Sequence, residues 1–402
     1  MQHSRSARAS RTSPLLAPAA AGLVLLLATS CRSAGGGNDL GSGASGAAST
    51  DGVTAESATG GTAESAEAPA RDLERALSWL VDSQEGDGSW APASGESAAM
   101  DPAGNRVGVT GLAALALLAE GNTLRGGPRK EPLRRAIAWL LDQQQESGLF
   151  GSPMGHTYLY GHAIGLLAVS EASVLTGEAA GLVPAVKRGT AYAERARNPY
   201  GAWRYDVPPV GDNDTSISGW MLTALCAARD AGAEVEAATF EGAWQWLDSV
   251  TDPETGRVGY DSRGSRSSRI PGVNDQYPSD AAETLTSVAM FARAISGAPQ
   301  PSDELARLQD DLLLAKLPLH DPEANLSDPY AWYFGSLAAF QRGGRLWKAW
   351  QPAMAEALAA AQDEDGSFPP SGPWDSLGGR TQSTALCAMT LTVQYRYSRL
   401  AR

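Results

Sequence analysis

Apolar positions recur along this chain in pairs of helical segments, and the two members of a pair differ in pattern. The first member has a single apolar stripe with charged positions opposite, which predicts an amphipathic helix. From about residue 72 the stripe consists of Leu73, Ala76, Leu77, Leu80 and Val81. The same spacing returns from residue 133 and again from residue 240.

The second member of each pair is apolar around most of its circumference, which predicts a helix that is buried on all sides. We expect such helices at residues 109–120, 161–172, 215–228, 281–295, 331–341 and 380–395. A turn containing glycine and an aromatic residue joins the two members, and its glycines are Gly88, Gly148, Gly201, Gly256 and Gly366. The last interval covers two units, so a degenerate turn is expected between Pro318 and Pro329.

Six pairs, each with an outer amphipathic and an inner buried helix, close naturally into a ring. The sequence therefore predicts an all-α protein, an (α/α)6 toroid of six helix pairs. Cys226 lies in the third inner helix and Cys387 in the sixth, on opposite sides of such a ring. A disulfide requires Cα atoms within about 7 Å. Both residues are therefore predicted to be free thiols.

The first 31 residues have the pattern of a secretory signal. Basic residues precede an apolar run from Leu15 to Ala28, which is too short to span a bilayer. Cys31 follows two small residues, as in the lipobox of bacterial lipoproteins, which this segment resembles. In that family the cysteine is acylated and becomes the first mature residue. The match departs from the pattern at Ala28, where the family prefers leucine, and an ordinary secreted protein with an incidental cysteine is the alternative.

Residues 32–68 are rich in Gly, Ser, Ala and Thr and hold no aromatic residue, which predicts a disordered tether. Residues 1–31 are thus expected to be a signal peptide, and residues 69–402 to form the toroid. A lipid anchor followed by a tether predicts an exported, membrane-anchored protein that faces the periplasm or the cell exterior.

Charge and cysteine usage exclude several classes of function. The net charge is −13, so the chain lacks the basic surface on which nucleic-acid binding depends. Membrane contact is expected through acyl chains rather than through attraction to anionic lipids. No Cys/His cluster and no phosphate-binding loop occurs. We therefore expect neither a metal nor a cofactor.

Two of the turns carry a more specific signature. The runs Gln84…Asp87-Gly88-Ser89-Trp90 and Gln362…Asp365-Gly366-Ser367-Phe368 resemble the repeats of the prenyltransferase and squalene-cyclase (terpenoid cyclase) family. The resemblance covers roughly residues 70–400 and is closest to a single-domain bacterial branch found on exported proteins. It implies the same toroid fold. The zinc ligands of the prenyltransferases have no match here.

The resemblance also identifies a candidate acid. Triterpene cyclases protonate their substrate with an Asp-x-Asp-Asp-Thr run, and this chain has Asp212-Asn213-Asp214-Thr215, which is one carboxylate short. Asp214 and Thr215 also precede an apolar run, so the alternative is a helix N-cap. The cyclases have a second toroid of similar size, which this chain lacks.

In a ring of helix pairs, the N-termini of all inner helices surround one mouth of the central cavity. There Asp214 and Glu283 are predicted to face each other as a candidate acid and base, with capping or pairing to Arg204 or Arg257 as the alternative. His162 is a candidate proton donor or a structural histidine. Aromatic residues expected to stabilise a cation, to line an apolar cavity or to fill the ring are Trp203, Tyr205, Trp220, Trp332 and Tyr333.

Three classes of function fit these features. One is a lyase, isomerase or transferase acting on an isoprenoid-like lipid. Another is a toroid that binds an apolar, isoprenoid-like small molecule or a protein partner without catalysis, which the incomplete acid motif favours. The third is a carbohydrate-active enzyme using Asp214 and Glu283. The fold alone does not decide among them.

Overall fold

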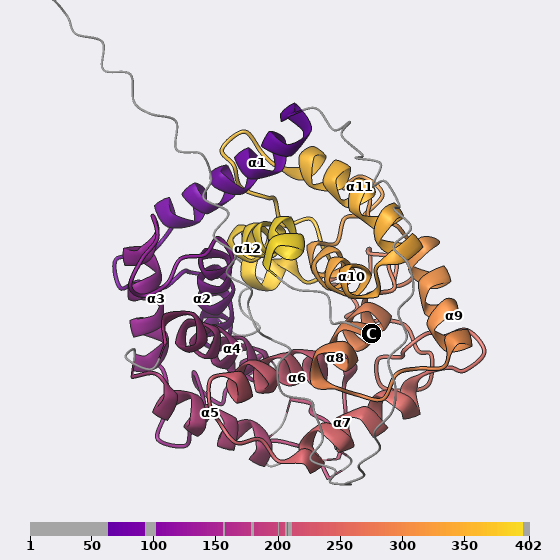
Figure 1. The fold of residues 1–402 in the computed structure, drawn as a ribbon, viewed down its shortest axis with the longest axis horizontal. Coiled ribbons are helices and arrows are strands. Elements are labelled where there is room, and N and C mark those ends of the chain that lie inside the picture. The colour runs from indigo at the N-terminus through magenta and orange to yellow at the C-terminus, as the bar shows by residue number, and fades with distance from the viewer. Residues whose placement is uncertain are drawn as a thin grey trace, which may run out of the picture.

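The computed structural model describes residues 63–92, 102–155, 157–177, 181–199, 201–205, 207 and 211–396. Cys31, the predicted signal peptide and residues 32–62 of the predicted tether lie outside the described residues, whereas residues 63–68 of that tether belong to the first helix. The described part of the chain is helical, with twelve helices and no strand. Figure 1 shows them as two concentric rings. The predicted all-α toroid of six helix pairs is confirmed.

Outer and inner helices alternate along the chain. The outer helices are α1 (Ala63–Asp82), α3 (Lys130–Asp142), α5 (Val183–Arg195), α7 (Ala237–Val250), α9 (Asp303–Leu314) and α11 (Gly344–Ala361). The inner helices are α2 (Pro102–Ala119), α4 (Tyr158–Thr176), α6 (Thr215–Asp230), α8 (Thr284–Ser296), α10 (Pro329–Arg342) and α12 (Asp375–Arg396). The predicted degenerate turn lies between α9 and α10.

The inner ring is closed. Each inner helix packs against the next along the chain, and α12 packs against both α10 and α2. Cys226 in α6 and Cys387 in α12 are both buried, and neither forms a disulfide, as predicted. Helix α4 is long and apolar enough to cross a bilayer, but most of it is buried in the ring, as expected for a core helix.

The turn glycines allow each pair to contact the next outer helix. Gly148 has φ +93°, and a Cβ there would lie 2.1 Å from the carbonyl oxygen of Arg188 in α5. Beside it, Gln144 Nε2 donates to the carbonyl oxygen of Ala185 at 2.9 Å. The sixth turn repeats this contact, because Gln362 Nε2 donates to Asp72 O in α1 at 2.8 Å. The glutamines of the repeat therefore join successive units and close the outer ring.

Candidate functional site

Asp214 lies at the N-terminus of α6 and is fully buried. Its Oδ1 accepts the backbone N–H groups of Ser216 at 2.6 Å and Ile217 at 3.3 Å. These are the bonds of a helix N-cap, since the first turn of a helix has N–H groups without intrahelical partners. Asp214 is therefore a helix cap, whatever further role it has.

Two tyrosines occupy the other side of this carboxylate. The Tyr205 hydroxyl donates to Asp214 Oδ2 and also shares a hydrogen bond with the Tyr260 hydroxyl. The Arg204 guanidinium lies 5.6 Å from the ring centroid of Tyr205 and 5.9 Å from that of Tyr260, within range of a cation–π contact. Both oxygens of Asp214 thus accept hydrogen bonds.

Burial dominates the electrostatics of this cluster. It raises the pKa of Asp214, although the hydrogen bonds from Tyr205 and Tyr260 act in the opposite direction. Burial, followed by the nearby Asp214 charge, raises the pKa of Tyr205 and of Tyr260. Both tyrosines therefore remain neutral phenols that can donate hydrogen bonds.

Side chains from α4, α6 and α10 extend the cluster to other inner helices. The Ser216 and Tyr330 hydroxyls are 2.8 Å apart, although α8 separates α6 from α10 in the ring. Tyr160 of α4 lies with its ring centroid 6.3 Å from that of Tyr205. We call Tyr160, Tyr205, Ser216, Tyr260 and Tyr330, together with Asp214, the mouth cluster. Its four tyrosines are all partly exposed.

Predicted aromatic residues lie beside the mouth cluster. The ring of Trp220 is 6.2 Å from Tyr333 and 6.3 Å from Tyr330, centroid to centroid. Phe334 packs edge-on against Trp220 at 5.1 Å. These side chains form an almost fully buried aromatic layer in contact with Tyr330. The structure thus brings Tyr205, Trp220 and Tyr333 together with Asp214.

Other predicted residues lie elsewhere. Trp203 is fully buried and donates from Nε1 to the carbonyl oxygen of Ala193, as Trp90 does to Leu80, so it packs within the repeat. Trp332 is buried beside His320. Asp212 has 72% of its side chain exposed and is 3.7 Å from Arg204.

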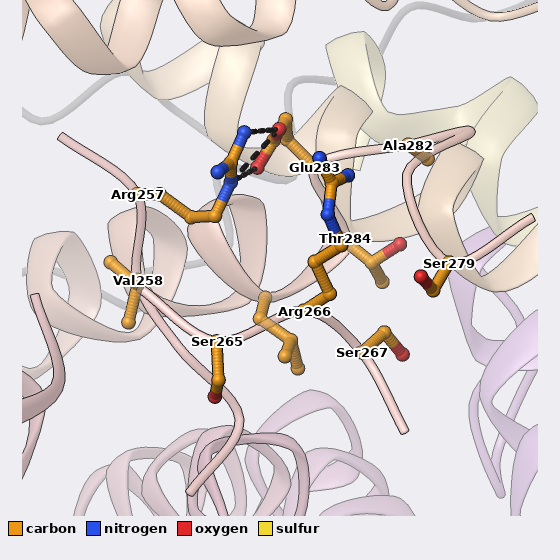
Figure 2. Close-up of a pocket in the computed structure, with 10 residues that line it drawn as sticks. Arg257, Val258, Ser265, Arg266, Ser267, Ser279, Ala282, Glu283 and Thr284 are labelled. Carbon is orange, nitrogen blue, oxygen red and sulfur yellow. Dashed lines mark hydrogen bonds and ion pairs between the residues drawn. The ribbon is translucent and has the colours of Figure 1, made fainter. Parts of the chain in front are cut away.

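Glu283 is held by Arg257, with contacts of 2.8 and 3.0 Å to the guanidinium. Figure 2 shows this pair beside a shallow pocket at the start of α8. Asp214 has a different set of partners, and neither carboxylate contacts the partners of the other. This arrangement favours the alternative in which Asp214 is a cap and Glu283 pairs with Arg257.

His162 is fully buried between α4 and α5. Its Nδ1 accepts the N–H of Phe150 at 3.2 Å, and its ring packs against Tyr192. Burial lowers the pKa of His162 to about 3, so the ring is neutral. In other units a hydroxyl oxygen accepts the corresponding backbone N–H of the turn. These hydroxyls belong to Thr110, Ser218, Thr286 and Thr384. The geometry favours a structural role for His162.

The structure also contains two buried carboxyls near each other, those of Asp328 and Asp375. Asp328 caps α10 by accepting the N–H of Ala331 at 3.0 Å, and Asp375 begins α12 and accepts the N–H of Gly372 at 2.8 Å. Burial raises the pKa of Asp328 to about 7 and that of Asp375 to about 6, and the Asp375 charge raises the former further. A sequence signal existed for Asp328, because Asp328-Pro329 is a helix-start pattern like Asp214-Thr215.

In the described part of the chain, no group of three or more His, Cys, Asp or Glu side chains is placed to hold a metal ion.

Solved structures of known proteins share this fold. The type II terpene cyclase MstE from Scytonema is 14% identical, with 81% of this chain and 98% of that chain covered and a TM-score of 0.56. The GH76A α-1,6-mannanase of Salegentibacter sp. HEL1_6 is 10% identical, with 82% and 100% covered and a TM-score of 0.54. A protein from Actinoplanes is 16% identical, with 81% and 99% covered and a TM-score of 0.53.

No protein-family model matches the chain, and no curated protein matches it in sequence. Identities of 10–16% show a common fold and leave the activity to be argued from the residues of the site.

Proposed function

We propose that this toroid binds a small molecule with an apolar, isoprenoid-like body at the mouth of its inner ring. The observation that carries the proposal is the convergence of the mouth cluster on the aromatic layer of Trp220, Tyr333 and Phe334. Aromatic rings beneath a few well-placed hydrogen-bonding groups are typical of small-molecule sites. Tyr160 and Tyr330 are partly exposed, and the Tyr330 hydroxyl, which bonds Ser216, has capacity for a second hydrogen bond to a polar group of the ligand.

Structural neighbours support a small-molecule ligand in this fold. MstE is described in complex with geranylgeranyl dihydroxybenzoate, and the mannanase in complex with α-1,6-mannotriose. The aromatic layer favours the first kind of ligand, because it presents rings rather than the many polar groups that a sugar requires. Glu283 is tied to Arg257, which weighs against a carboxylate pair for glycan cleavage.

Titration with farnesol, an isoprenoid alcohol delivered in detergent micelles, tests this proposal. We expect saturable binding by calorimetry and a loss of up to about tenfold in affinity for Tyr330→Phe, since one hydrogen bond is worth about 0.5–1.5 kcal/mol. Tyr395→Phe, at an exposed tyrosine near the end of α12, is the matched control and should bind as the wild type does. Absence of saturable heat with the wild type would contradict the proposal.

Proton donation by Asp214 is the second candidate function. It is favoured by burial, which raises the pKa of this carboxyl as a catalytic acid needs. Against it, both oxygens accept hydrogen bonds, so no proton is directed at the aromatic layer. Conversion of farnesol by the wild type that is lost in Asp214→Asn would establish the catalytic role.

We also propose that the protein is exported and held at a membrane by acylation of Cys31. The support is the sequence pattern of a signal ending at this cysteine, followed by the tether of residues 32–68. Stable anchoring takes two or more acyl chains. Cys31→Ser should therefore move the protein from the membrane fraction to the soluble fraction. An unchanged membrane fraction would overturn the proposal.

A further inference from the structure

The loop that precedes α8 begins with a rigid base. Residues 260–283 connect the fourth turn to α8, whereas residues 151–157 make the equivalent connection to α4. At the start of the longer loop, the N–H groups of Gly259 and Gly264 both donate to Val250 O of α7, at 2.9 and 3.0 Å. Ser265 Oγ accepts the N–H of Tyr260 at 2.9 Å. Residues 259–265 are therefore fixed to the outer ring.

The next fifteen residues, 266–280, form a closed unit. Arg266 and Asp280 join its two ends through an ion pair of 3.5 Å. Arg269 lies inside it and donates to the carbonyl oxygens of Tyr277 at 3.0 Å and Pro278 at 3.2 Å. A surface loop with close ends and its own internal contacts is an Ω-loop. Such a loop can move as a unit, because its internal hydrogen bonds need not break.

The attachment of this segment to the rest of the ring is slight. Asn274 is 1% exposed, and its Nδ2 donates to Pro373 O, just before α12, at 2.9 Å. Within the described ranges, this is the one hydrogen bond that joins residues 266–280 to the segments leading into α10 or α12. The other residues of the segment are exposed or partly exposed. Segments with few buried contacts open at low free-energy cost.

We propose that residues 266–280 form a lid over the inner-helix N-termini of α8, α10 and α12, which opens from its base to admit the ligand. The inference rests on the ligand-binding function proposed for the mouth cluster and adds its route of access. Tyr260 links the two, because it belongs to the mouth cluster and lies in the base from which the lid extends.

The two ends of the lid lie at the surface, beside a shallow pocket. This pocket is lined by Arg266, Ser267 and Ser279 of the lid and by Glu283 and Thr284 at the start of α8. Because Arg266 is exposed and Ser267 and Ser279 are partly exposed, the ends of the lid can swing without displacing core side chains.

Buried carboxyls beneath the lid couple its position to pH. Arg269 lies near Asp328, and Tyr277 lies near both Asp328 and Asp375. The other titratable groups that act on this pair are Tyr330 of α10 and Cys387 of α12. Burial raises the pKa of both carboxyls, to about 7 and about 6.

Opening the lid hydrates the pair and brings each pKa back towards the ordinary range. The closed lid therefore binds protons more tightly than the open lid, so ionisation favours opening as the pH rises through about 6 to 7. The positive charge of Arg269 offsets part of this effect, since it stabilises the ionised form of Asp328 in the closed state.

Hydrogen–deuterium exchange of the ligand-free full chain tests the lid. After correction for intrinsic rates, we expect exchange in residues 266–280 to be about tenfold faster at pH 7.5 than at pH 5.5, since each pKa unit changes an equilibrium tenfold. Asp328→Asn combined with Asp375→Asn should abolish the difference. Asp275→Asn, which removes an exposed carboxylate of the lid itself, is the matched control and should retain it.

Equal protection at the two pH values in the wild type, or a difference that survives in the double variant, would overturn the lid. If the double variant does not fold, Asn274→Ala takes its place. It should raise exchange in residues 266–280 at both pH values, and an unchanged rate would again overturn the proposal. Because no ligand is present, failure here is distinct from failure of the farnesol titration.

Discussion

Ionisation of the buried carboxyls is expected to lower the free energy of unfolding as the pH rises from about 4 to about 8, and it outweighs the opposite contribution of buried His162, whose pKa is lowered to about 3. The pKa of Asp328 rises from 3.8 to about 7 on burial. Between these values the folded state holds a proton that the unfolded state has released, so raising the pH favours unfolding. At about 1.4 kcal/mol per pKa unit, Asp328 alone contributes about 4 kcal/mol.

Asp328→Asn isolates this contribution, because asparagine caps a helix about as well as aspartate and does not ionise. Chemical denaturation at a series of pH values should give a flatter profile for the variant, which should exceed the wild type in stability at pH 8. Asp142→Asn, at an exposed position at the end of α3, should leave the profile unchanged. A wild-type slope in Asp328→Asn would show that the carboxyl is not buried as described.

The architecture was predictable because every repeat has the same apolar stripe and the same turn glycine. The stripe at Leu133, Ala136, Ile137 and Leu140 is the buried face of α3, and Gly148 stands where the turn meets the carbonyl of Arg188. Each of these features depends on neighbours within one unit or the next. Local pattern is therefore sufficient to find them, and six copies imply the closed ring.

The site was only partly predictable. Asp214, Tyr205, Trp220 and Tyr333 follow from the N-terminus of an inner helix and from the resemblance. Tyr260 and Tyr330 come from other helix pairs and contact the cluster only in the folded ring. Their spacing in the sequence therefore does not predict these contacts.

His162 was ambiguous for a related reason, because it occupies a position where other units have threonine or serine. Only the buried hydrogen bond from Phe150 N–H to His162 Nδ1 distinguishes this structural role from proton donation at the mouth of the ring. Asp328 caps α10 and Asp375 begins α12, and the approach of these two helix starts depends on the packing of α10 against α12.

Asp214→Ala is expected to lower the free energy of unfolding by about 1–3.5 kcal/mol. Loss of an N-cap costs about 0.5–2 kcal/mol, and loss of the hydrogen bond from Tyr205, whose hydroxyl keeps its bond to Tyr260, adds about 0.5–1.5 kcal/mol. Asp214→Asn retains an oxygen for the cap and an amide beside Tyr205, so it should lose less than about 1 kcal/mol. Denaturant titration of the two variants beside the wild type measures the difference. Equal stability of Asp214→Ala and the wild type would show that the cap bonds contribute nothing.

Occupancy of the ring is the most direct test of the central claim, that the mouth cluster holds a small molecule. Wild type and Asp214→Asn, each purified from cells under mild conditions, should be compared by native mass spectrometry. We expect both to carry the same additional small-molecule mass, since the cap and the aromatic layer persist in the variant. A wild-type protein with no mass beyond that of the polypeptide and its covalent modifications would contradict the account.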